Sequence, residues 1–133
     1  MSTFVLDASA LLTLIEDEKG ADRVEEIFRG GSFVLPWVGL LEVHYISLLE
    51  RDEEEADRRL ALLTQSGGSV VWDVDPVVLH FASGFKARHS LSFADALTAA
   101  YAAAHDAVLV HKDPELEVLR GRVELEALPY KRR

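Results

Sequence analysis

The sequence contains no cysteine among its 133 residues. Disulfide bonds and thiolate metal sites are therefore both excluded. No apolar run approaches the roughly 20 residues that a membrane-spanning helix needs. The N-terminal residues also lack a basic region followed by a long apolar run, because Asp7 interrupts the only candidate, so we expect no signal peptide. These absences together predict a cytoplasmic protein that does not enter a membrane.

The sequence has no internal repeat, no low-complexity tract and no linker long enough to divide it into domains. Its hydrophobic content of 49% is enough for one core at this length. We therefore expect a single domain over residues 1–133.

Basic residues are few, since 14 Lys and Arg stand against 23 Asp and Glu and the formal net charge is −9 at pH 7. Proteins that bind nucleic acid usually carry a basic surface, because binding releases the cations condensed on phosphate. A role on nucleic acid would thus require a local basic patch with bound metal, or a dimer that concentrates the basic residues. The same charge suits a basic protein partner.

Segments typical of strands and of helices alternate along the chain, which predicts an α/β fold with a mainly parallel sheet. The predicted strands cover Thr3–Leu6, Ser32–Leu35, Ser69–Trp72, Ala107–Val110 and, at a possible edge, Val123–Leu125. The predicted helices cover Ala8–Glu16, Ala21–Phe28, Trp37–Arg51, Asp52–Gln65, Pro76–Arg88, Phe93–His105 and a short Pro114–Leu119. A basic tail, Lys131–Arg133, ends the chain.

Two acidic residues follow predicted strands: Asp7 after the first and Asp113 after the fourth. In an open α/β sheet, ligands bind just outside the carboxyl ends of strands. Both residues also have a structural explanation. Asp is a favoured N-cap, which fits Asp7, and Asp113 with Pro114 is a standard helix opening.

Two more acidic residues lie on predicted helices. Asp95 follows Ser92 at the spacing of a capping box, in which the acid reaches back to a backbone N–H. Glu42 lies in a helix that is apolar on most of its circumference, which predicts burial. No Lys or Arg lies one turn away from it. Because a lone buried Glu is costly unless it is paired or bound to metal, we interpret Glu42 as functional.

If these four acids converge, their carboxylates repel one another. Two carboxylates ~4 Å apart at an effective dielectric near 20 repel by about 4 kcal/mol, so a cation is needed to offset the repulsion. Oxygen ligands without Cys, and without a pair of His spaced for zinc, point to Mg²⁺ or Mn²⁺. Such an ion lowers the pKa of a bound water, orients a phosphate and stabilises a leaving oxygen.

Four motifs resemble those of PIN-domain ribonucleases, most closely the toxins of VapC-type toxin–antitoxin modules in bacteria and archaea. They are Val5–Leu11, Leu41–Val43, Leu91–Leu97 with its alanine-rich continuation, and Val108–Asp113. They occur in the expected order and cover essentially the whole chain. The resemblance implies a single PIN-like domain, a three-layer α/β/α fold with a central mainly parallel sheet.

The same resemblance implies an acidic quartet of Asp7, Glu42, Asp95 and Asp113 as the catalytic residues. Asp7, Asp95 and Asp113 would hold one or two Mg²⁺ or Mn²⁺ ions, and Ser9 would orient a carboxylate or bind water. Similar proteins cut RNA, leave a 5′-phosphate and a 3′-hydroxyl, and are held inactive by a cognate antitoxin. We therefore expect an RNA substrate, an antitoxin partner and a homodimer.

Lys86, Arg88 and His89 form the only basic cluster near the predicted site, so we expect them to contact phosphate. The alternative is a solvated helix end whose cations complement the helix dipole. His111 stands where the family often has Thr or Ser, and it either hydrogen-bonds phosphate or packs in the core.

The leading hypothesis is a metal-dependent endoribonuclease that acts as the toxin of a toxin–antitoxin module. One alternative is a phosphotransferase with Asp7 as the nucleophile, although that chemistry usually uses a second Asp where Ser9 stands. The other is a non-catalytic PIN-like scaffold whose acidic pocket binds basic partners.

Overall fold

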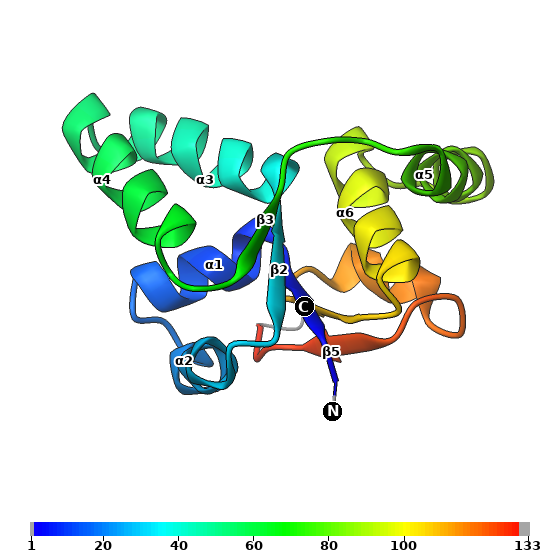
Figure 1. Ribbon diagram of the computed structural model, residues 1–133, viewed down its shortest axis with the longest axis horizontal. Helices are drawn as coiled ribbons and strands as arrows, with labels where there is room; N and C mark the ends of the chain where they lie inside the picture. Colours follow the sequence, from blue (N-terminus) through cyan, green and yellow to red (C-terminus); the bar gives the residue numbers. More distant parts are fainter. Residues whose placement is uncertain (1, 131–133) are drawn as a thin grey trace.

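The computed structural model describes residues 2–130, which are arranged around one parallel sheet (Figure 1). Its five strands lie in the order β3-β2-β1-β4-β5. They are β1 (Phe4–Leu6), β2 (Phe33–Pro36), β3 (Ser69–Val71), β4 (Val108–His111) and β5 (Leu125–Ala127). The central strand β1 pairs with two neighbours, so that Val5 lies opposite Val34 in β2 and Leu109 in β4. The predicted central parallel sheet is therefore confirmed.

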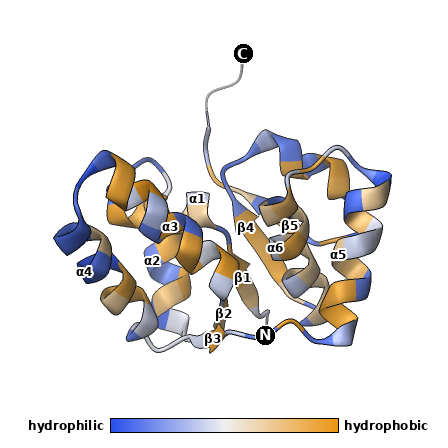
Figure 2. Ribbon diagram, turned by 90° about the horizontal axis from the view of Figure 1, so that it is seen from above, coloured by the Kyte–Doolittle hydropathy of each residue, from blue (hydrophilic) through white to orange (hydrophobic). Residues whose placement is uncertain are grey.

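Helices cover both faces of this sheet, which confirms the three-layer α/β/α fold (Figures 1 and 2). One layer contains α1 (Ala8–Ile15), α2 (Ala21–Gly30), α3 (Trp37–Glu50) and α4 (Glu53–Thr64). The other contains α5 (Pro76–Arg88), α6 (Phe93–Ala104) and the 3₁₀ helix η1 (Pro114–Leu119). No helix within residues 2–130 has both the length and the apolar content needed to cross a bilayer.

Successive residues of β1 contribute to two separate cores. Leu6 packs with residues of the first helical layer, such as Leu40 of α3. Val5 packs with residues of the second layer, such as Ala99 of α6 and Leu116 of η1. Because successive side chains of a strand point to opposite faces, a strand between two helical layers is apolar throughout.

Two elements differ from the sequence prediction. The edge strand is Leu125–Ala127 rather than Val123–Leu125. Val123 is buried in the second core and forms only an isolated bridge with Arg120, so its apolar character reflects packing rather than strand pairing. The short helix Pro114–Leu119 is a 3₁₀ helix.

The burial predicted for α3 is wrong on one side of the helix. Leu41, Tyr45 and Leu49 are 53%, 46% and 78% exposed, whereas Leu40 and Val43 are buried. Residues four apart share a helix face, so the exposed residues form one apolar strip. An apolar circumference does not distinguish a helix inside the core from one that offers an apolar surface to another molecule.

Tyr101 of α6 links the two helical layers through its hydroxyl group. This residue is fully buried. Its hydroxyl accepts a hydrogen bond of 2.8 Å from Trp37 Nε1 at the start of α3 and donates one of 2.5 Å to the carbonyl of Asp73, which precedes α5. The hydroxyl thus connects α3, α6 and the segment that leads into α5.

Replacing Tyr101 with Phe should lower the free energy of unfolding by about 1–3 kcal/mol, because the substitution leaves the indole N–H and the Asp73 carbonyl without this partner. Urea denaturation followed by circular dichroism measures the change. Tyr45→Phe removes the same hydroxyl from an exposed position of α3 and should change stability by less than about 0.5 kcal/mol. Equal effects of the two substitutions would contradict the role of the Tyr101 hydroxyl.

Candidate functional site

The carboxyl ends of β1 and β4 meet at one edge of the sheet. Leu6 pairs with Val110, so the residues that follow each strand emerge side by side. The Ser9 hydroxyl joins them, because it accepts a hydrogen bond of 2.9 Å from the Lys112 amide and donates one of 2.6 Å to Asp7 Oδ1. Ser9 therefore orients the Asp7 carboxylate relative to the end of β4.

Asp7 combines a structural role with a position at this edge. It is the N-cap of α1, and its Oδ1 accepts a hydrogen bond of 2.9 Å from the Ala10 amide. The residue is only 5% exposed. No hydrogen bond from residues 2–130 reaches its other oxygen, Oδ2. One oxygen therefore caps the helix, and the second remains available to a ligand.

Three further carboxylates form a compact group at the same edge. Each of Asp95, Asp113 and Glu115 offers one oxygen, and these oxygens all lie within 4.8 Å of one another. Asp95 comes from the first turn of α6, Asp113 is the N-cap of η1, and Glu115 lies in its first turn. The starts of α6 and η1 thus bring together oxygen atoms that could hold a metal ion.

The pKa shifts link this group to Asp7 and Glu42. Burial raises the pKa of Asp7 to about 7 against the hydrogen bonds from Ser9 and Ala10, and the charges of Asp95 and Glu42 raise it further. Burial likewise raises the pKa of Glu42, and the charges of Asp95 and Asp113 add to the effect. The four acids that the sequence singled out therefore lie close enough to repel one another.

Asp95 belongs fully to this cluster. Burial is the largest cause of its raised pKa, followed by the charge of Asp113, while the charge of Glu115 adds to the shift and the nearby Ser92 side chain opposes it. The Ser92 hydroxyl accepts a hydrogen bond of 3.0 Å from the Asp95 amide, and this bond is one half of a capping box. No reciprocal hydrogen bond from the Ser92 amide to the Asp95 carboxylate occurs within residues 2–130. Ser92 therefore caps the Asp95 amide, whereas the Asp95 carboxylate does not cap Ser92 in return.

Glu115 is absent from the sequence prediction. The sequence feature that could have indicated it is the segment Asp113–Glu115, because Pro114 favours a helix start there and places Glu115 in the first turn. The Asp113 side chain accepts a hydrogen bond of 2.9 Å from the Glu115 amide. This bond closes a tight turn that holds the two carboxylates on the same side of η1. An exposed Glu in a first turn is otherwise explained by the helix dipole, and for that reason the sequence alone did not single it out.

His111 was expected either to bind phosphate or to pack, and the structure places it in the core. It is fully buried. Its Nδ1 accepts the Asp113 amide at 3.1 Å, so its Nε2 carries the proton and donates to Glu117 at 2.8 Å. With both nitrogens engaged, His111 does not face a substrate. It supports the loop that carries Asp113.

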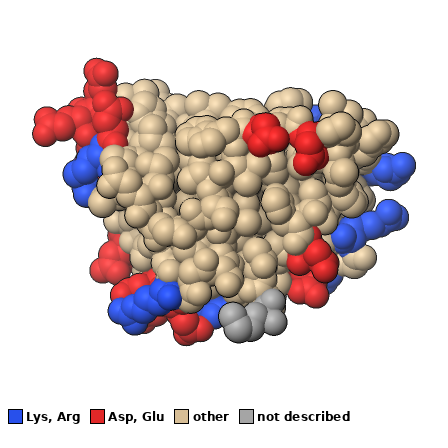
Figure 3. All heavy atoms as spheres, viewed as in Figure 1, with Lys and Arg blue, Asp and Glu red and all other residues tan. Residues whose placement is uncertain are grey.

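The expected basic cluster is divided between the two sides of α5. Arg88 and His89 line a small pocket together with Arg122. Lys86 points elsewhere, and its ammonium group donates a hydrogen bond of 2.7 Å to the Leu91 carbonyl. Figure 3 shows basic side chains along the edge of the molecule beside α5 and the segment after η1, far from the acidic side chains of α4.

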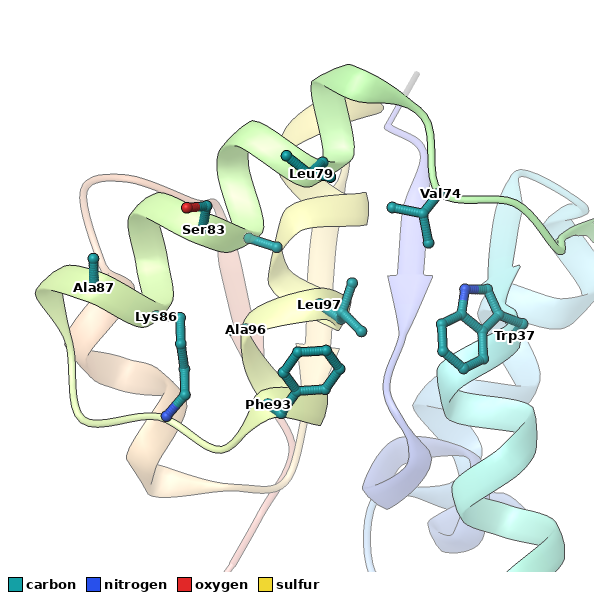
Figure 4. Close-up of a pocket in the computed structure, with 10 residues that line it drawn as sticks. Trp37, Val74, Leu79, Ser83, Lys86, Ala87, Phe93, Ala96 and Leu97 are labelled. Carbon is teal, nitrogen blue, oxygen red and sulfur yellow. The ribbon is translucent and has the colours of Figure 1, made fainter.

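An apolar groove of about 520 Å³ lies on the side of α5 where Lys86 is found (Figure 4). Leu79 of α5, Phe93 and Leu97 of α6 and Trp37 of α3 contribute to its lining. Phe93 stands two residues before Asp95 and is 71% exposed. The groove is therefore an open apolar surface that borders the helix carrying one of the acids.

Comparison with known proteins supports the same fold. The family model of the PIN domain matches residues 4–121. A chain of the VapBC2 complex from Rickettsia felis, solved bound to a DNA fragment from its promoter, has a TM-score of 0.78 at 13% identity, over 96% of this chain and 99% of that one. A chain of the DNA-bound VapBC complex from Salmonella typhimurium has a TM-score of 0.74 at 19% identity, over 96% of this chain and 98% of that one.

VapBC-1 from nontypeable Haemophilus influenzae gives a TM-score of 0.71 at 18% identity, over 94% of this chain and 97% of that one. A search of curated protein sequences finds no match. Because the PIN model spans most of the sequence, the chain belongs to the PIN domain family.

Without metal, the protein should lose stability as the pH rises from about 4 towards 8. The folded-state pKa of Asp7 is about 7 against 3.8 for the unfolded chain, so the folded state binds the proton more tightly. That contribution is complete below pH 3.8 and is lost as the pH passes through 7. Asp7→Asn should remove this part of the decline, since an amide oxygen can still accept from Ser9 and Ala10.

Chemical denaturation in EDTA at several pH values between 4 and 8 measures the effect. Asp52→Asn is the matched control, because Asp52 also caps a helix but lies exposed at the start of α4. The control should keep the wild-type pH dependence. An Asp7→Asn protein with the same pH dependence as the wild type would contradict the raised pKa.

Proposed function

We propose that the protein is a metal-dependent endoribonuclease and the toxin of a toxin–antitoxin module. The observation that carries the proposal is the convergence of Asp7, Glu42, Asp95, Asp113 and Glu115 at the carboxyl edge of the sheet. No Lys or Arg within residues 2–130 makes an ion pair with any of these carboxylates. A bound cation would supply the missing positive charge.

The donor set fits Mg²⁺ or Mn²⁺, since it consists of carboxylate oxygens without sulfur or imidazole. Asp95, Asp113 and Glu115 are placed to hold the ion, and the free Oδ2 of Asp7 is the next available ligand. When bound, such an ion supplies a water of lowered pKa and neutralises charge on the phosphate.

The other residues of the site would orient these ligands. Ser9 and the Ala10 amide hold Oδ1 of Asp7, so rotation of the carboxylate is restricted. His111 holds the amide of Asp113. Glu42 approaches from α3, where burial and the charges of Asp95 and Asp113 raise its pKa, and a bound cation would favour its charged form.

The two alternative functions make different demands on the same residues. A phosphotransferase with Asp7 as the nucleophile usually uses a second Asp two residues on, but Ser9 stands there and donates its hydroxyl to Asp7 Oδ1. A non-catalytic scaffold remains compatible with the net charge of −9 and is separated from a nuclease by the cleavage assay below.

Asp95→Asn should reduce RNA cleavage by about a hundredfold or more, which is the usual effect of removing one group that stabilises charge in the transition state. Initial rates on a labelled RNA with Mg²⁺, and with EDTA in its place, measure the change. Asp75→Asn makes the same substitution at the N-cap of α5 and should leave the rate unaltered. Cleavage that persists in EDTA, or an active Asp95→Asn protein, would overturn the proposal.

The same assay tests Glu115 as a ligand. Glu115→Gln should raise the Mg²⁺ concentration needed for half-maximal rate by about tenfold, while the rate at saturating Mg²⁺ changes less. Titration of Mn²⁺ by calorimetry gives an independent reading of affinity. Glu124→Gln, at an exposed position before β5, is the control and should leave both measurements unchanged.

We also propose that a cognate antitoxin binds this chain, as expected for a VapC-type toxin. The similar structures are described as VapBC complexes, and one related structure as a toxin–antitoxin complex from Klebsiella pneumoniae. The acidic charge suits a basic partner, and the strip Leu41, Tyr45 and Leu49 on α3 offers an apolar surface of the kind that marks interaction sites. Co-purification with the product of a neighbouring reading frame tests this.

The homodimer would be formed through the apolar groove around Leu79, Phe93 and Trp37, since homodimer interfaces are more apolar than other surfaces. Leu79→Glu should convert the dimer to a monomer, because it places a charge in that interface. Light scattering coupled to size exclusion measures the mass. Leu62→Glu, at a similarly exposed leucine of α4, should leave the dimer intact. A monomeric wild-type protein would contradict the expected homodimer.

A further inference from the structure

The outer side of α5 carries a pocket of about 190 Å³ with a cationic lining. His80, Arg88 and His89 line it from α5 and the residue that follows this helix. Arg122 lines it from the segment after η1. No Asp or Glu within residues 2–130 is part of the lining. In a chain with a net charge of −9, the lining of this pocket therefore contains two guanidinium groups and no carboxylate.

Both guanidinium groups of the pocket are free to bind an anion. Six other basic side chains within residues 2–130 are paired with acids, namely Arg23, Arg29, Arg58, Arg59, Lys112 and Arg120. Neither Arg88 nor Arg122 makes an ion pair in the same part of the chain. Arg is also the side chain best suited to phosphate, because its planar donors engage two oxygens at once.

A glycine makes room for one of these groups. A Cβ built on Gly84 would lie 2.5 Å from Nη1 of Arg88, which is closer than real contacts allow. The end of the Arg88 side chain therefore lies over the helix backbone at Gly84, and a larger residue there would make it move. A glycine in the middle of a helix costs about 1 kcal/mol relative to alanine, so Gly84→Ala is tolerated by the helix itself and acts mainly on the position of Arg88.

The remaining wall of the pocket is aromatic. The rings of Phe81 and Phe85 are stacked with their centroids 5.9 Å apart. Phe85 is buried, whereas Phe81 is 39% exposed. Single-stranded RNA is commonly bound by stacking an unpaired base on an exposed aromatic ring while basic side chains hold the phosphate.

We propose that this pocket binds one nucleotide of single-stranded RNA, with Arg88 and Arg122 on the phosphate and Phe81 against the base. The proposal rests on the nuclease function and names where the substrate strand is held outside the acidic cluster. The helix η1 connects the two places, since Asp113 precedes it and Arg122 follows it. Its six residues rise about 12 Å at ~2 Å per residue, a length that a few nucleotides span.

Fluorescence anisotropy with a labelled single-stranded RNA, in EDTA so that no strand is cut, tests the pocket. Arg88→Ala and Arg122→Ala should each weaken binding about tenfold and lower the slope of log affinity against log salt by about 0.7, the value for one lost phosphate contact on a single strand. Arg51→Ala removes an exposed arginine that is also unpaired within residues 2–130, at the end of α3, and should change neither quantity.

The substitution Gly84→Ala tests whether the position of the Arg88 guanidinium group matters in addition to its charge. The added methyl group displaces the guanidinium group, so RNA binding should weaken severalfold although the net charge stays the same. The melting temperature should not fall, because alanine favours the helix. Long-chain inorganic polyphosphate is the competitor that distinguishes a nucleotide from a bare anion, and it should displace RNA only weakly.

The outcomes are distinct from those of the cleavage assay. Unchanged RNA affinity in both Arg88→Ala and Arg122→Ala would overturn the pocket while leaving the nuclease function intact. Polyphosphate that competes as well as RNA would overturn the stacking of a base on Phe81. Weakened RNA binding in these variants, in a protein that never cuts RNA with Mg²⁺, would support the pocket and overturn the nuclease.

Discussion

Repulsion between carboxylates at the carboxyl edge of the sheet is the constraint that shapes this protein. Two such groups ~4 Å apart cost about 4 kcal/mol at an effective dielectric near 20. That is a large part of the 5–15 kcal/mol by which domains are usually stable. The protein keeps the cluster because both adjoining strands are buried between two cores and because Ser9 joins the strand ends. Burial, followed by the neighbouring negative charges, raises the pKa values of Asp7, Glu42 and Asp95, so the charged forms of these carboxylates are disfavoured when no cation is present.

Sequence patterns were sufficient for β1, β2, β3 and β4 but not for the edge strand β5, because a parallel strand between two helical layers must be apolar on both faces. The acids after β1 and β4 could be placed for the same reason, since parallel strands end at the same edge. Glu115 could not be found in this way. Its placement depends on the backbone of a 3₁₀ turn that begins at Asp113, and a first-turn glutamate is common without any ligand.

Burial was the quantity that the sequence predicted least well. The helix that carries Glu42 was expected to be buried, yet Leu49 on it is exposed, and the sequence left open whether His111 binds phosphate or packs, whereas the structure buries it fully. Hydropathy describes a side chain, but burial depends on which neighbours cover it. The partners of His111 are the Asp113 amide and Glu117, and neither contact follows from a spacing in the sequence.

The two sides of α5 have opposite characters, with the apolar groove on one and the cationic pocket on the other. If two copies associate through their grooves, their cationic pockets remain uncovered on separate flanks of the assembly. A strand long enough to reach both would be held at two points, and the second attachment would be intramolecular. Avidity of this kind would let an acidic protein retain long single strands while releasing short fragments.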